Sequence, residues 1–96
     1  MTRTIEGGCL CGQVRYRIDG EPIASVTCQC RSCRRASAAP VVPWLHLDAR
    51  NFAFTAGRPL EFRSSPPVIR SFCGRCGSPL TYWNESYGNK IDVTTC

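Results

Sequence analysis

Residues 73–77 read CGRCG, and residues 8–12 read GCLCG. Two cysteines separated by two residues form a turn that directs both sulfur atoms at one metal ion, and the following glycine allows the positive φ that such a turn often needs. This turn supplies only two of the four ligands of a structural Zn²⁺, so another pair must come from elsewhere. We predict that Cys9, Cys11, Cys73 and Cys76 form a structural zinc site that joins segments more than sixty residues apart. The alternative is two reduced thiol motifs without metal.

The length of 96 residues suits one domain, and we predict a single domain over residues 1–96. Eight of the residues are cysteines, a fraction at which secreted chains are commonly disulfide scaffolds. The N-terminal sequence MTRTIEGG lacks the apolar segment of a secretory signal, so we expect the protein in the cytoplasm, where thiols stay reduced. Seven of the cysteines lie in three clusters, and clustering favours metal binding over disulfide bonds.

The formal net charge of +5 treats every cysteine as a neutral thiol. Seven thiolates and two bound Zn²⁺ would change this charge by −3 and leave about +2. Four arginines lie within or beside the cysteine clusters: Arg31, Arg34, Arg35 and Arg75. We expect them to balance thiolate charge rather than to bind phosphate, and we expect no nucleic-acid partner.

Short segments separated by Gly and Pro predict β structure along most of the chain. Val14, Tyr16 and Ile18 alternate with polar residues, which is typical of a strand with one buried face. Residues 31–39 can form one or two helical turns before Pro40. Further short strands are expected at residues 23–27, 41–47, 52–54, 60–62, 68–72, 80–83 and 91–94. The prediction is an all-β fold of seven or eight short strands, with little helix, in which bound metal holds the strands together.

Residues 28–33 read CQCRSC and contain three cysteines that the first site does not use. Three thiolates can hold one Zn²⁺ and leave its fourth coordination position open for water or substrate, which is the arrangement of catalytic zinc. Because thiolate is a soft ligand and zinc lowers the pKa of a bound thiol, a thiol is the natural substrate. We predict that Cys28, Cys30 and Cys33 form a catalytic zinc site, so that the chain binds two Zn²⁺.

Two other residues could complete the second site and make it structural. His46 lies in an alternating apolar segment, where a histidine is more often a hydrogen-bonded strand residue than a ligand. Cys96 is the last residue, and terminal residues are seldom held precisely. Arg70 is either a substrate-binding cation or a charge on a strand surface. The aromatic residues are expected to pack in the core or at its rim: Trp44, Tyr82, Trp83 and Tyr87.

Three segments together resemble the signature of a known family: GGCLCGQVRYRI at residues 7–18, CQCRSCRRAS at 28–37 and RSFCGRCGSPLTY at 70–82. They are similar to the ordered cysteine motifs of the glutathione-dependent formaldehyde-activating enzymes, also called the centromere-protein-V domain family. The resemblance extends from Gly7 to about Val93 and implies a small zinc-bearing β-tent of short antiparallel sheets.

The resemblance also implies roles for the cysteines. The first and last pairs match the family's structural zinc site, and the triplet Cys28, Cys30 and Cys33 matches its catalytic zinc site. The implied enzyme is a carbon–sulfur lyase that condenses formaldehyde, or a related aldehyde, with glutathione to S-(hydroxymethyl)glutathione. The implied partner is a small glutathione-like thiol. No apolar run in the sequence approaches the length of a membrane span, so we expect no membrane association.

The chain is short for this family, whose members generally continue beyond the strand expected at residues 91–94. We therefore expect that a C-terminal segment is missing and that the exposed sheet edge could be covered in a homodimer. The alternative function is a zinc-stabilised binding module without catalytic activity, and a third is a thiol-redox or metal-buffering protein. An open fourth position on the second zinc favours the enzyme, whereas a fourth protein ligand favours the module.

Overall fold

The computed structural model describes residues 3–95. The elements in this range are β1 (Thr4–Gly8), β2 (Arg15–Asp19), β3 (Ala24–Cys28), α1 (Arg31–Ser37), β4 (Val42–Asp48), η1 (Ala49–Asn51), β5 (Phe52–Ala56), β6 (Leu60–Ser65), β7 (Val68–Phe72), β8 (Pro79–Asn84), η2 (Glu85–Tyr87) and β9 (Lys90–Thr94). The predicted fold of short strands with little helix is confirmed. No helix in the described range is long and apolar enough to cross a membrane.

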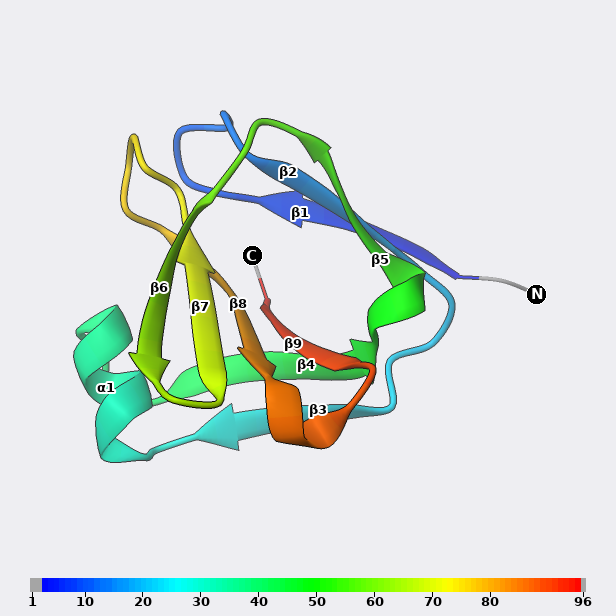
Figure 1. Ribbon diagram of the computed structural model, residues 1–96. Helices are drawn as coiled ribbons and strands as arrows, with labels where there is room; N and C mark the ends of the chain where they lie inside the picture. The colour runs from blue at the N-terminus through cyan, green and yellow to red at the C-terminus, as the bar shows by residue number, and fades with distance from the viewer. Residues whose placement is uncertain (1–2, 96) are drawn as a thin grey trace.

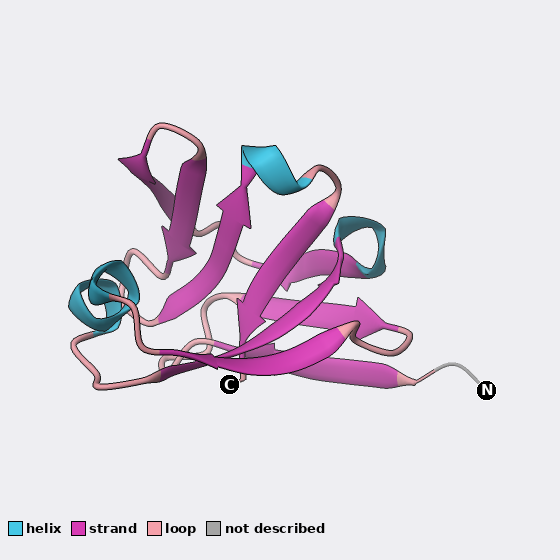
Figure 2. Ribbon diagram, turned by 90° about the horizontal axis from the view of Figure 1, so that it is seen from below, coloured by secondary structure: helices cyan, strands magenta, loops and turns pink. Residues whose placement is uncertain are grey.

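The strands form two antiparallel sheets (Figure 1). The small sheet has the order β1–β2–β5, and the large sheet has the order β3–β4–β9–β8–β7–β6. Figure 1 shows the small sheet lying across one end of the strongly twisted large sheet. The view from below shows the helical segments at the edges of these strand layers (Figure 2). The two sheets together make the tent-like arrangement that the sequence motifs imply.

One strand, β1, was not predicted from the sequence pattern. β1 has no regular apolar alternation and ends in two glycines, which have low strand propensity, so no strand was predicted before residue 14. It forms because it pairs with β2 along its whole length, from Thr4 opposite Asp19 to Gly8 opposite Arg15. A Cβ atom at Gly8 would overlap the carbonyl oxygen of Val14. Glycine at position 8 therefore permits the close approach of the two backbone segments beside Cys9.

The main core lies between the two sheets. The alternation in β2 places Tyr16 and Ile18 on its buried face, where they contact Leu47 of β4 and Val93 of β9. Burial of each such apolar side chain contributes about 1.5–3 kcal/mol. The Tyr16 hydroxyl also donates a hydrogen bond of 2.7 Å to the Thr94 carbonyl oxygen. These contacts hold the small sheet on the β4–β9 pair. They thereby position the β1–β2 turn, which carries Cys9 and Cys11, at the end of the small sheet.

Candidate metal centres

The first cysteine cluster forms where the β1–β2 turn meets the β7–β8 turn. Its four sulfur atoms, from Cys9, Cys11, Cys73 and Cys76, all lie within 4.8 Å of one another. The distance between Cys9 Sγ and Cys11 Sγ is 3.6 Å, and that between Cys11 Sγ and Cys73 Sγ is 3.7 Å. A disulfide would need about 2.05 Å. The sulfur atoms therefore converge without bonding, in a group that could hold one metal ion.

Backbone N–H groups point at the sulfur atoms of this cluster. The Val14 N–H donates to Cys9 Sγ at 3.3 Å and lowers the pKa of Cys9. The N–H groups of Arg75 and Cys76 donate to Cys73 Sγ at 3.3 and 3.4 Å. Such donors stabilise thiolates, the form of cysteine that binds metal. The turns thus supply both the ligand atoms and their hydrogen bonds.

The other two thiols of the cluster have strongly different pKa values. The hydrogen bond with Ser78 lowers the pKa of Cys76 to about 5. A backbone hydrogen bond from Gln13 acts in the same direction on Cys11, but desolvation of the thiol and the neighbouring cysteines together raise the pKa of Cys11 to about 11. Four thiolates this close repel one another, so the cluster needs a cation to ionise fully. Gly77 follows the second pair with φ of +80°, as the motif predicts.

The second cluster lies at the junction of β3 and α1. Cys28 ends β3, Cys30 is the N-cap residue of α1 and Cys33 lies in the first turn of the helix. The Cys33 N–H donates to Cys30 Sγ at 3.3 Å, and this bond lowers the pKa of Cys30 to about 7. Cys33 is only 3% exposed, and its burial raises its pKa to about 11 although Arg70 acts in the opposite direction. The three sulfur atoms lie within 4.8 Å of one another.

No fourth histidine, cysteine or carboxylate joins this triplet among residues 3–95. His46 lies on β4, where its Nδ1 is 2.6 Å from Asp92 Oδ1 on the neighbouring strand β9. It is therefore a hydrogen-bonded strand residue. Cys96, the other candidate for a fourth ligand, lies outside the described residues. Within residues 3–95, the triplet has the three-ligand composition that an open metal site requires.

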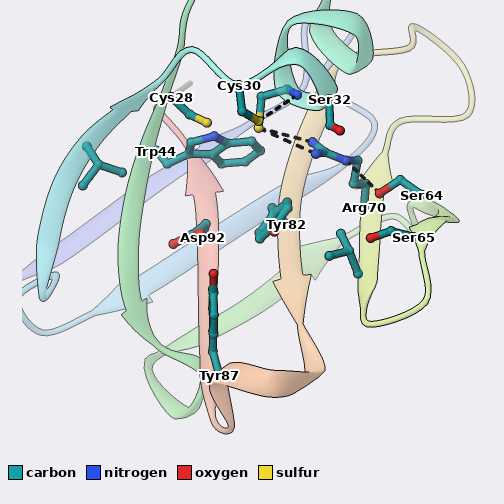
Figure 3. A pocket seen from close by; sticks show the side chains of 13 residues that line it. Cys28, Cys30, Ser32, Trp44, Ser64, Ser65, Arg70, Tyr82, Tyr87 and Asp92 are labelled. Atoms are coloured by element: carbon teal, nitrogen blue, oxygen red, sulfur yellow. Dashed lines mark hydrogen bonds between the residues drawn. The ribbon is translucent and has the colours of Figure 1, made fainter.

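A cavity of about 280 Å³ opens beside the triplet (Figure 3). The rings of Trp44 and Tyr82 form part of its wall, with their centroids 6.0 Å apart. Figure 3 shows Asp92 and Tyr87 on the side of the cavity away from Cys28 and Cys30. All three cysteines line this space, so a small molecule that enters it can reach the sulfur atoms.

The arginine that contacts the triplet comes from a distant strand. The sequence predicts Arg31, Arg34 and Arg35 as partners of the thiolates, but all three are exposed, and no hydrogen bond joins them to sulfur in the described part of the chain. Arg70 of β7 makes this contact instead, with Nη1 and Nη2 at 3.7 and 3.6 Å from Cys33 Sγ.

Both sequence-based interpretations of Arg70 miss its contact with sulfur. The residue is 9% exposed, so it is not a charge on the strand surface. A signal was present in the sequence, because Arg70 falls between Val68 and Phe72 in a period-2 pattern and so shares their face of the strand. The pattern indicates burial but not the partner.

Comparisons with known proteins agree with this architecture. A family model described as "Glutathione-dependent formaldehyde-activating enzyme" matches residues 4–96. The crystal structure of a Rhodobacter sphaeroides protein, a target of Northeast Structural Genomics, is similar to this chain with a TM-score of 0.78 and 18% sequence identity. The match covers 94% of this chain and 84% of that chain. At this identity the structural similarity shows a shared fold.

Proposed function

The chain belongs to the family of glutathione-dependent formaldehyde-activating enzymes, and we propose that it is a zinc-dependent carbon–sulfur lyase that joins a glutathione-like thiol to formaldehyde or a related aldehyde. The observation that carries this proposal is the cysteine triplet, which lines a cavity and has no fourth protein ligand within residues 3–95. Structural zinc sites are closed by four protein ligands, whereas catalytic sites keep one position for water or substrate.

Zinc suits the geometry of the cysteine clusters. A tetrahedral Zn²⁺ with Zn–S bonds of about 2.3 Å places its sulfur ligands about 3.8 Å apart. The sulfur distances of 3.6 and 3.7 Å in the four-cysteine cluster are close to this value. We assign a structural zinc to Cys9, Cys11, Cys73 and Cys76 and a catalytic zinc to Cys28, Cys30 and Cys33. A cytoplasmic location would keep these thiols reduced.

The proposed reaction forms one carbon–sulfur bond. The thiol sulfur attacks the aldehyde carbon, the C=O π bond becomes a C–O single bond, and the proton lost by the thiol ends on that oxygen. Nothing is oxidised or reduced. Zinc with an open position supplies the lowered pKa of the incoming thiol. The rings of Trp44 and Tyr82 form part of the wall of the cavity beside the triplet, where the thiol and the aldehyde would meet.

Native mass spectrometry with and without glutathione tests the site before any assay of turnover. We expect two zinc ions per chain and a bound glutathione. Formation of S-(hydroxymethyl)glutathione should then be followed by NMR, with the uncatalysed reaction subtracted. The matched control is Cys30→Ser, which should keep the first zinc, lose the second and show no catalysed rate.

Two zinc ions without glutathione binding, together with a rate equal to the uncatalysed one, would contradict the proposed enzyme. That result would favour the alternative function, a zinc-stabilised binding module. Binding of glutathione without catalysis of the formaldehyde reaction would leave the thiol site in place and require a different aldehyde.

A further inference from the structure

Arg70 is a buried cation with several partners. It lies in the middle of β7, and its side chain lines the cavity and points toward the cysteine triplet (Figure 3). Both terminal nitrogens contact Cys33 Sγ, and Nε donates to Ser64 Oγ at 3.0 Å. The guanidinium carbon also lies 4.9 Å from the centroid of the Tyr82 ring, which is within cation–π distance. Three neighbouring groups therefore hold the guanidinium in one place.

A buried guanidinium needs a nearby negative charge, because an unpaired charge is strongly disfavoured away from water. No ion pair joins Arg70 to an aspartate or glutamate within residues 3–95. Asp92 lines the same cavity, but Tyr82 pairs between Arg70 and Asp92 in the sheet, and Asp92 is hydrogen-bonded to His46. The group in contact with Arg70 that can carry a negative charge, as a metal-bound thiolate, is the sulfur of Cys33.

We propose that Arg70 is the positioning residue and built-in counter-cation of the cysteine triplet. It holds Cys33 Sγ in place for metal binding and offsets part of the thiolate charge. Three thiolates carry −3, a divalent metal carries +2 and the guanidinium carries +1, so the loaded site is neutral. A neutral site accepts an anionic sulfur as its fourth ligand more readily than a negative site does. This last consequence rests on the proposed function, whereas the positioning role rests on the contacts alone.

Within residues 3–95, the four-cysteine cluster has no such cation, and this difference supports the role proposed for Arg70. Its sulfur atoms accept hydrogen bonds from backbone N–H groups and lie near the Ser78 hydroxyl, and no guanidinium contacts them among the described residues. Four thiolates and one divalent metal leave that site at −2. The buried cation therefore distinguishes the triplet from the closed site, as expected if only the triplet exchanges its fourth ligand.

The test measures metal affinity at each site separately. The variants Arg70→Met and Arg70→Lys are loaded with Zn²⁺, and the metal is then titrated with a chromophoric chelator while native mass spectrometry counts the ions. We expect Arg70→Met to keep the first zinc and to bind the second roughly 10–100-fold more weakly, as for other residues that orient metal ligands. Arg70→Lys should recover part of the loss, because it keeps the charge but lacks the planar pair of donors.

Two further variants complete the test. Arg35→Met removes an exposed arginine of α1 that does not contact sulfur, and the affinity for the second zinc should stay within about twofold of the original. Ser64→Ala leaves the guanidinium in place but removes the acceptor of its Nε, and Ser64 is exposed, so the fold should tolerate this change. We expect an intermediate loss of affinity for the second zinc only.

Unchanged affinity for the second zinc in Arg70→Met would overturn the proposal. Equal weakening of both zinc sites in Ser64→Ala would do the same, because it would show a general structural role. Cobalt substitution adds a spectroscopic readout: the sulfur-to-cobalt charge-transfer band of the triplet should change in Arg70→Met, while that of the four-cysteine site should not. These readouts do not depend on turnover, so the proposed enzyme can fail while the role of Arg70 stands.

Discussion

Replacing a cysteine should lower the stability of the protein much more in one cluster than in the other, because only one of them joins distant parts of the chain. We compare Cys73→Ser with Cys30→Ser. Cys73 is 1% exposed, and its sulfur meets that of Cys11, which is 62 residues away in the sequence. Cys30 is exposed, and all three members of its cluster lie within residues 28–33. The first substitution opens a long closed loop, whereas the second leaves the chain topology unchanged.

The size of the effect follows from the loop. In the chain-entropy model, a cross-link that closes a loop of about 60 residues stabilises the folded state by about 4 kcal/mol. A domain of 96 residues has a free energy of unfolding of only about 5–14 kcal/mol. At about 4–8 °C per kcal/mol, Cys73→Ser should lower Tm by roughly 15–30 °C. The new hydroxyl, buried at the site of Cys73, adds to this loss.

Cys30→Ser should lower Tm by less than about 5 °C. A serine hydroxyl is a good N-cap, so the hydrogen bond from the Cys33 N–H to residue 30 survives and α1 still begins there. The contiguous triplet can also bind metal in the unfolded chain, and binding to the unfolded state reduces the stabilisation that a metal provides. Loss of the second metal therefore changes global stability little.

Thermal melts followed by circular dichroism, with metal content measured on the same samples, check both expectations. Equal falls in Tm for the two variants would refute the reasoning, and so would a larger fall for Cys30→Ser. A Cys73→Ser chain that melts normally with one metal bound would show that the four-cysteine cluster does not hold the fold together.

Three further predictions concern the removal of metal, the contribution of Asp48 to stability at low pH, and the turn that contains Gly57. Limited chelation should remove the metal of the triplet first and leave the far-ultraviolet circular dichroism spectrum unchanged, whereas exhaustive chelation should unfold the chain. Arg50 lowers the pKa of Asp48 from 3.8 to about 2, so the carboxylate stabilises the fold above about pH 4 and this contribution is lost as the pH falls toward 2. Urea unfolding should therefore show Asp48→Asn less stable than the original protein at pH 7, with the difference beginning to narrow as the pH falls below about 4. Gly57 has φ of +72°, and a Cβ there would overlap the Gln13 carbonyl oxygen, so Gly57→Ala should lower the free energy of unfolding by at least about 1–3 kcal/mol in the same measurement.

Local features of this protein were readable from its sequence. The spacing of Cys73 and Cys76 places both residues on one turn, and Gly77 has the positive φ that the motif requires. The alternation of Tyr16 and Ile18 with arginines identified the buried face of β2. These features depend on residues that are close in the chain, where backbone geometry alone sets which side chains lie together.

The surroundings of the triplet were decided by the tertiary structure. Arg31 and Arg34 are its neighbours in sequence, yet the guanidinium on Cys33 comes from Arg70, 37 residues away. The rings of Trp44 and Tyr82 lie side by side in the cavity wall because β4 and β8 flank β9 in the large sheet. A period-2 pattern shows which face of a strand is buried but not which strands are neighbours. Strand order depends on long-range packing, and it determines the partners of the thiolates and the walls of the cavity.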